Sequence, residues 1–218
     1  MKEQEFQNGM NYIRGYHGTF NSSENRIKSH GFTPSEGEKH WLGDGVYFYR
    51  DDRTQAEIWT RNKKKYLLQS KKESSDNLQG RVCQINLMIK DDEFLNLDSR
   101  DGAEYMFTLF NDLLESLGIE DVGGLRAKTN LYLMNMALFK LVDKKYKVIQ
   151  RTYPVKSGRF DKHQFVPLNT LMFLPIKRGK STTSKEKPYI ETPLLNGCQI
   201  VVRDLSLIEQ QELQWFAC

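Results

Sequence analysis

The sequence has few cysteines, and the three it has, Cys83, Cys198 and Cys218, lie far apart. An odd number of thiols at such spacing supplies neither a disulfide framework nor the paired ligands of a zinc site. The four histidines add no metal-like spacing. We therefore expect a cytoplasmic protein, in a reducing compartment, that holds no metal.

Long apolar runs are also missing. No stretch approaches the roughly 18 apolar residues that a membrane helix needs. The first nine residues are polar and lack the apolar segment of a secretory signal. The sequence therefore predicts neither a membrane span nor export.

Neither sign of charge predominates, because 32 Lys and Arg are nearly balanced by 28 Asp and Glu, which leaves a net charge of +4. That excess is too small to diagnose a nucleic-acid-binding protein. What the sequence does have is apolar material, 39% of 218 residues, which suffices for one core. With no internal repeat and no long linker, residues 1–218 are expected to form a single domain.

Helical and alternating patterns follow one another in no regular strand–helix–strand order, which favours an α+β fold. Period-two alternation is clearest from Cys83 to Ile89. Further strands are expected at 12–19, 45–49, 146–151, 165–174 and 199–203. Helices are expected at 23–29, after a cap at Asp51 or Asp52, and over 131–142.

The longest helix is predicted from an apolar stripe between residues 103 and 117. Asp101 and Glu104 form a plausible capping box at its start, and Gly118 is a plausible end. The residues of the stripe are Ala103, Met106, Phe107, Phe110, Leu113, Leu114 and Leu117.

Three short motifs stand out: His17-Gly18-Thr19, the run Gly43-Asp44-Gly45-Val46-Tyr47-Phe48, and the strand that begins with Gln199. Taken singly, each has an ordinary explanation. A histidine beside a glycine is commonly a structural hydrogen-bonding group, 46–48 is a good strand, and a glutamine on a strand commonly faces solvent. Their order and spacing together point to a site.

Together these motifs resemble the catalytic domain of the diphtheria-toxin-like ADP-ribosyltransferases, the superfamily that includes the poly(ADP-ribose) polymerases. That family carries a histidine, a tyrosine and a third residue, usually glutamate, on three separate strands. His17, Tyr47 and Gln199 fall at these positions, and the neighbouring residues Ile27, Ser29, Gly31 and Ala56 also fall in register.

The resemblance is dense over residues 12–59, returns over 197–208 and is unspecific between them. It implies a split antiparallel β-sheet like that of the poly(ADP-ribose) polymerase catalytic domain. The helical region, about 101–144, would then be an insertion packed on this core.

The resemblance implies NAD⁺ as co-substrate, and the residue types suit it. A ribose hydroxyl can accept from His17, and Gly18 lets the backbone approach a carboxamide closely. Tyr47 can stack on a nicotinamide ring, with another aromatic on the opposite side. The expected NAD⁺-binding residues are His17, Gly18, Thr19, Tyr47, Tyr49, Ala56 and Trp59.

The third position departs from the family because it is glutamine. Gln199 keeps a hydrogen bond to a ribose hydroxyl but lacks the negative charge. In the family, loss of this glutamate usually goes with transfer of single ADP-ribose units or with lost activity. Glu191, in the segment entering the strand, either supplies the missing carboxylate or is an ordinary loop residue. The predicted catalytic residues are His17, Tyr47, Gln199 and Glu191.

Two basic stretches flank the motifs, at 61–72 and at 177–187. Such runs are usually solvated surface segments, and few aromatic residues lie within these two. The alternative is that they steer a phosphate-rich acceptor, RNA or DNA, toward the site. The acceptor is therefore left as nucleic acid or protein.

The sequence predicts a mono-ADP-ribosyltransferase, acting in its own cell as a bacterial toxin or antiphage effector and restrained by a neutralising antitoxin. One alternative is an NAD⁺-dependent RNA 2′-phosphotransferase of the same superfamily, although its further basic and histidine motifs are missing. Another is a degenerate, non-catalytic module that binds NAD⁺ or ADP-ribose, which Gln199 makes credible.

Overall fold

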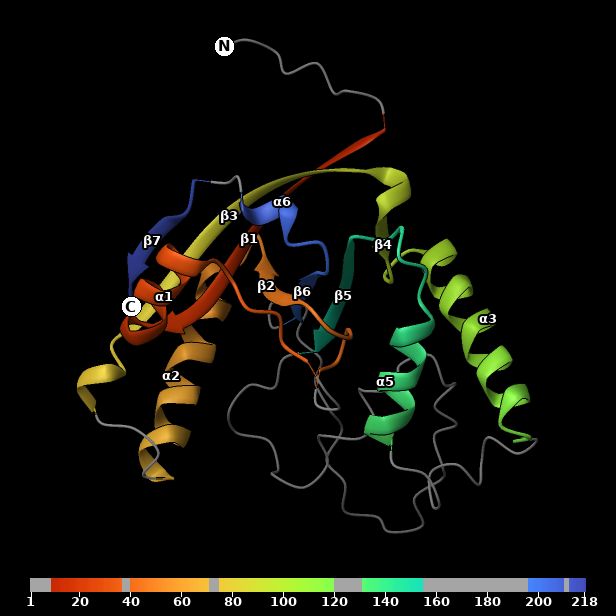
Figure 1. The fold of residues 1–218 in the computed structure, drawn as a ribbon, viewed down its shortest axis with the longest axis horizontal. Coiled ribbons are helices and arrows are strands. Elements are labelled where there is room, and N and C mark those ends of the chain that lie inside the picture. Colours follow the sequence, from red (N-terminus) through yellow and green to blue (C-terminus); the bar gives the residue numbers. More distant parts are fainter. Residues whose placement is uncertain (1–8, 37–39, 71–74, 120–130, 155–195, 210–211) are drawn as a thin grey trace, which may run out of the picture.

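Seven strands form one mixed sheet in the order β4-β5-β6-β2-β1-β3-β7 (Figure 1). The computed structural model describes residues 9–36, 40–70, 75–119, 131–154, 196–209 and 212–218. The strands are β1 (Met10–Phe20), β2 (Val46–Arg50), β3 (Gly80–Lys90), β4 (Phe94–Asn96), β5 (Val148–Pro154), β6 (Asn196–Val202) and β7 (Gln214–Ala217).

Five α-helices accompany the sheet in the described residues. They are α1 (Asn21–His30), α2 (Arg53–Gln69), α3 (Arg100–Ser116), α5 (Leu131–Leu141) and α6 (Ser206–Glu209), with short 3₁₀ turns at Ser75–Asn77 and Asp91–Glu93. The α+β class is confirmed. None of the described helices combines the length and apolarity needed to cross a membrane.

The expectation of a wholly antiparallel sheet is wrong at one edge, where β4 and β5 pair in parallel. The chain between them passes through α3 and α5, and such a crossover permits parallel pairing. Sequence patterns also missed β4 and β7, which have three and four residues and are too short to show a period. The strand expected at 165–174 lies outside the described residues.

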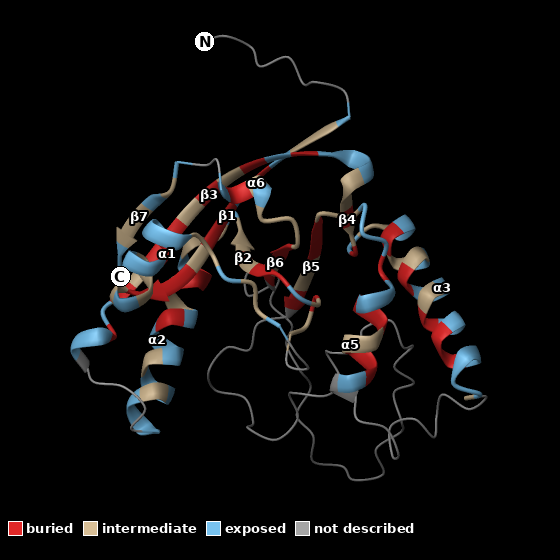
Figure 2. Ribbon diagram, in the orientation of Figure 1, coloured by how far each residue is buried: buried red, intermediate tan, exposed pale blue. Residues whose placement is uncertain are grey.

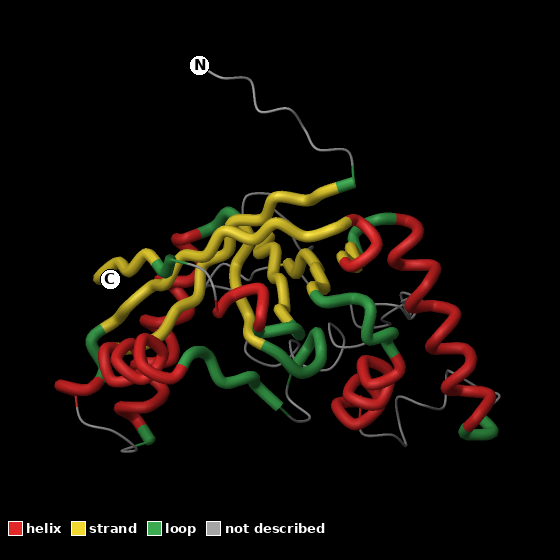
Figure 3. Tube along the Cα trace, turned by 45° about the horizontal axis from the view of Figure 1, so that its top comes forward, coloured by secondary structure: helices red, strands yellow, loops and turns green. Residues whose placement is uncertain are grey.

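The long ladder between β1 and β3 forms one half of the sheet, running from Met10 opposite Lys90 to Phe20 opposite Gly80. The predicted alternation in β3 is confirmed, because Cys83, Ile85, Leu87 and Ile89 are all buried. Helices α1 and α2 contact this half, whereas α3 lies by β4 and contacts α5 (Figure 3).

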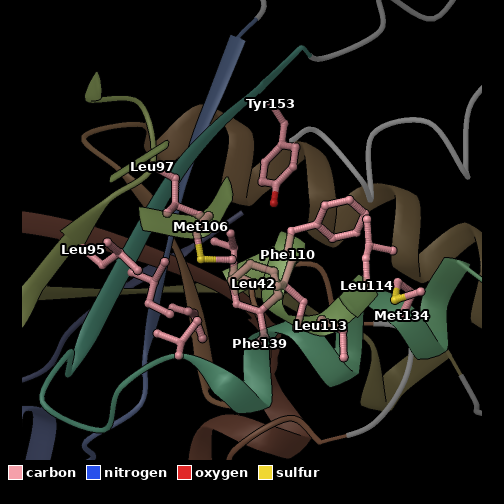
Figure 4. Packing of buried hydrophobic residues seen from close by; sticks show 14 residues of the cluster. Leu42, Leu95, Leu97, Met106, Phe110, Leu113, Leu114, Met134, Phe139 and Tyr153 are labelled. Atoms are coloured by element: carbon pink, nitrogen blue, oxygen red, sulfur yellow. The ribbon is translucent and has the colours of Figure 1, made fainter. Parts of the chain in front are cut away.

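The predicted apolar stripe of α3 forms a large core with α5 and the β4–β6 side of the sheet (Figure 4). Phe110 and Leu138 pack there against residues of the strands such as Ile149. Two members of the expected stripe, Phe107 and Leu117, are instead exposed, at 44% and 55%. The helical region about 101–144 thus supplies half of a main core.

Two predictions of helix caps have different outcomes. Asp52 caps α2, because its carboxylate accepts a hydrogen bond from the Gln55 backbone N–H at 3.0 Å. The capping box at Asp101 is wrong, since Ser99 caps α3 by accepting from the Gly102 N–H at 3.1 Å. Asp101 lies inside the first turn, where its charge still suits the helix N-terminus.

Candidate functional site

The three motifs lie on adjacent strands, where the sheet splits. Strand β1 pairs with β2 only at Gly15 and Tyr16. Strand β2 pairs along its other edge with β6, where Tyr49 lies opposite Gln199. Beyond Tyr16 the ladder between β1 and β2 ends, so the motif residues of β1 pair with β3 on one edge and face a gap on the β2 side.

His17 bridges this gap, since its Nδ1 lies 2.8 Å from the backbone oxygen of Tyr47. A carbonyl can only accept, so Nδ1 carries the hydrogen. The ring is also held edge-on by Phe32, at 5.4 Å between centroids, and tilted against Phe48 at 5.6 Å. Both contacts fix the imidazole in one orientation.

Burial lowers the pKa of His17 below its ordinary value of 6.5, against the opposing effect of the bond to Tyr47. The neutral ring then has Nδ1–H as donor and Nε2 as acceptor. This reverses the expected direction of its ribose contact: a hydroxyl would donate to Nε2 of His17 instead of accepting from it.

Gly18 presents its backbone to the gap. The Asp51 N–H donates to the Arg14 carbonyl at 2.9 Å, which shows that the backbone groups of Arg14 face β2. Because a strand alternates with period two, the N–H and C=O of Gly18 face the same side, beyond the last paired residue. A backbone donor and acceptor therefore point together into the gap.

Packing against α2 also leaves no room for a side chain at Gly18. A Cβ there would lie 2.4 Å from the Ala56 carbonyl oxygen and 2.5 Å from Thr60 Oγ1 of α2. Ala56, which was predicted to bind NAD⁺, is fully buried at this contact and is not among the residues that line the cleft described below. It sets how closely α2 approaches β1.

Tyr47 is fixed through its hydroxyl, which accepts from the Leu42 N–H at 2.9 Å and donates to the Gly43 carbonyl at 2.7 Å. Burial raises the pKa of Tyr47 well above its usual range, so the phenol stays neutral. From α5, Asn135 Nδ2 lies 3.3 Å from the carbonyl oxygens of both His40 and Trp41. The helical region thus holds the turn that orients Tyr47.

The turn itself depends on Gly45, whose φ of +146° disfavours any side chain. A Cβ there would lie 2.6 Å from the carbonyl oxygen of Val202 in β6. Backbone bonds in both directions tie Gly45 to Ser35, at 2.8 and 3.0 Å. The second motif therefore keeps glycine for conformation and for close approach to β6.

Gln199 lies in a row across the sheet, opposite Tyr49 on one side and Arg151 on the other. Burial raises the pKa of Tyr49 to about 12, while a hydrogen bond from Gln199 acts in the lowering direction. The Gln199 side chain carries both a donor and an acceptor, so its amide oxygen is chemically able to accept a hydrogen bond from a ligand hydroxyl.

A cleft of about 510 Å³ opens at the split. Seven of the nine predicted residues line it, whereas Ala56 does not, and Glu191 lies outside the described residues. Cys198 is also not among the lining residues, as alternation along β6 predicts. The seven predicted residues that line the cleft are His17, Gly18, Thr19, Tyr47, Tyr49, Trp59 and Gln199.

Two exposed cations at the cleft were not among the predicted site residues, although Lys63 belongs to the basic stretch at 61–72. Arg26 of α1 and Lys63 of α2 both line it. The signal for Lys63 was its place one helical turn after Trp59, whereas nothing in the sequence set Arg26 apart from other surface residues. Two aromatic faces, a backbone donor–acceptor pair and two cations suit a ligand with a flat amide ring and a diphosphate.

Comparison of the chain with known protein families and with solved structures finds no match. Among curated proteins, an uncharacterized protein of Methanocaldococcus jannaschii is 48% identical over 46 residues, which is 20% of this chain. The chain spans 22% of that protein's length. A stretch this short does not place the chain in a family.

Proposed function

We propose that the protein transfers single ADP-ribose units from NAD⁺ to a macromolecular acceptor. The observation that carries this proposal is the meeting of His17, Tyr47 and Gln199 on adjacent strands around one cleft. Residues from three distant parts of the sequence line one wall, in the order that the resemblance to ADP-ribosyltransferases predicts. A volume of about 510 Å³ is in the range of small-molecule sites.

The chemistry of the lining residues suits the nicotinamide, the diphosphate and a ribose of NAD⁺. The Gly18 backbone pair suits the carboxamide, and Tyr47 and Trp59 offer aromatic faces to the nicotinamide ring. The cations Arg26 and Lys63 suit the diphosphate. His17 Nε2 and the Gln199 amide oxygen are acceptors for ribose hydroxyls.

The reaction breaks the bond between nicotinamide and ribose. Nicotinamide leaves with the bonding electron pair, a nucleophile of the acceptor bonds to the anomeric carbon, and the acceptor loses a proton. The transition state has oxocarbenium character, so holding the ribose rigidly lowers the barrier. Gln199 orients the ribose but adds no negative charge, and this favours slow, single transfers.

Release of nicotinamide from NAD⁺ tests the proposal, measured by chromatography with and without a cell lysate as acceptor. His17→Ala should reduce release by about 100-fold, the cost of a misplaced reactive group. Cys198→Ser is the matched control, because Cys198 adjoins Gln199 but does not line the cleft. Absence of release by the unaltered protein under every condition would contradict transfer.

The uncharged third residue specifically favours a second candidate, a module that binds NAD⁺ without cleaving it. Gln199→Glu separates the two. In a weak transferase the added carboxylate should increase nicotinamide release. In a binding module, NAD⁺ should bind to both forms with release from neither, as equilibrium dialysis with labelled NAD⁺ would show.

A further inference from the structure

Helix α2 carries a stripe of aromatic and basic side chains that begins in the cleft and leaves it. Trp59, Lys63 and Tyr66 are spaced four and three residues apart, which places them on one side of the helix. Trp59 and Lys63 line the cleft, and Tyr66 lies one turn further out. The Lys63 ammonium lies 5.6 Å from the centre of the Tyr66 ring.

Both aromatic side chains of this stripe are exposed. Trp59 is 40% exposed and Tyr66 is 55% exposed. From residue 61 to residue 70 the helix and its cap have no buried residue (Figure 2). The outer part of α2 thus presents large, flat side chains to solvent.

The same part of α2 is strongly basic. The sequence has no acidic residue between Glu57 and Glu73, and Glu57 itself pairs with Arg53 at 2.8 Å. Within the described part of the chain, no ion pair involves the four helical cations of this segment. They are Arg61, Lys63, Lys64 and Lys65.

We propose that this stripe of α2 binds single-stranded nucleic acid and leads it to the cleft as the acceptor. Cations contact phosphates without regard to sequence, and exposed aromatic rings stack on unpaired bases. Trp59 and Tyr66 are about 10 Å apart along the helix axis, with Lys63 between them beside the passing backbone. A duplex would hide the base faces that these rings recognise.

This inference rests on the proposed function for its reaction but not for its binding, so binding is measured first and without NAD⁺. The probes are short, fluorescently labelled single strands of mixed sequence, one of DNA and one of RNA, with the DNA duplex as comparison. Fluorescence anisotropy at low and high salt should show tighter binding of a single strand than of the duplex. That affinity should fall steeply as salt rises.

Tyr66 is the residue to change, because it lies outside the cleft. Tyr66→Ala should weaken single-strand binding by at least about fivefold, and Tyr66→Phe, which keeps the ring, should bind like the unaltered protein. Tyr12→Ala is the matched control: Tyr12 is an exposed tyrosine of β1, at 64%. It should leave binding unchanged.

Three results would overturn the proposal: no single-strand binding at low salt, duplex binding as tight as single-strand binding, or unchanged binding by Tyr66→Ala. The proposed function fails separately, if strands bind but nicotinamide is never released. In a lysate with labelled NAD⁺, the label should be transferred to nucleic acid, so digestion with nuclease should remove it from the macromolecular fraction. Label that resists nuclease and yields to protease would show a protein acceptor and also reject the inference.

Discussion

Helices α2 and α3 have the same length, 17 residues, yet they meet the sheet in opposite ways. Helix α3 buries large apolar side chains, among them Met106 and Phe110. Helix α2 buries only Gln55, Ala56 and Thr60. Helix α3 is held by the burial of large apolar side chains. Helix α2 is held by close packing against the sheet, which its small buried residues and Gly18 permit.

The two helices therefore contribute differently to the surroundings of the cleft. The large core at α3 and α5 anchors the turn that orients Tyr47, through Asn135. Helix α2 buries few residues, and the aromatic and basic side chains of the proposed binding stripe are exposed on it.

The largest expected effect is on the α3 side. Phe110→Ala removes a side chain that is 1% exposed and should lower the free energy of unfolding by about 3–5 kcal/mol. Phe107→Ala, on the same helix but 44% exposed, should cost less than about 1 kcal/mol. Urea unfolding measures both, and equal losses would contradict the assignment of the core.

On the α2 side, adding one methyl group should destabilise the protein. Gly18→Ala places a methyl group against the Ala56 carbonyl and Thr60 Oγ1, which should destabilise the protein by about 1–3 kcal/mol. Adding Thr60→Ala should restore only part of this loss, because the Ala56 carbonyl belongs to the backbone. Unfolding within about 0.5 kcal/mol of the unaltered protein would show that α2 moves away freely.

The caps should behave alike in the two helices despite their unequal cores. Asp52→Ala and Ser99→Ala each remove one side-chain acceptor from a helix N-terminus. Each should cost about 1 kcal/mol in thermal or urea unfolding. A cost confined to one of them would show that the other helix is held at its start by something besides its cap.

A pH dependence is expected on the cleft side. Burial lowers the pKa of His17 in the folded protein, so the unfolded chain takes up this proton first as pH falls below about 6.5. Stability from this group is therefore present above that pH and decreases below it. His17→Gln should reduce the difference between the free energies of unfolding at pH 7 and pH 5, measured by urea unfolding, and an unchanged difference would contradict this assignment.

Much of the fold could be predicted because its elements have strong periods. Strand β3 alternates along its length, and α3 carries an apolar stripe over several turns. The failures fall where local signals are weak or competing. Strands β4 and β7, with three and four residues, are too short to show a recognisable alternation. Ser99 competes with Asp101 as a cap, since both precede the stripe.

The site could be predicted in its motifs but less well in its contacts. Order and spacing brought His17, Tyr47 and Gln199 together, because each belongs to a strand of its own. The direction of the His17 hydrogen bond depends on where the ladder between β1 and β2 ends, which no sequence pattern shows. Arg26 reaches the cleft only because α1 follows β1 directly.

The pairing of β2 with β6 has a consequence for synthesis. Strand β2 is synthesised early, but its pairing partner along one edge, Asn196–Val202, is synthesised near the end of the chain. Pairing between such distant segments closes late in folding. An emerging chain therefore carries His17 and Tyr47 long before the cleft exists, and any activity begins only once β6 has joined the sheet.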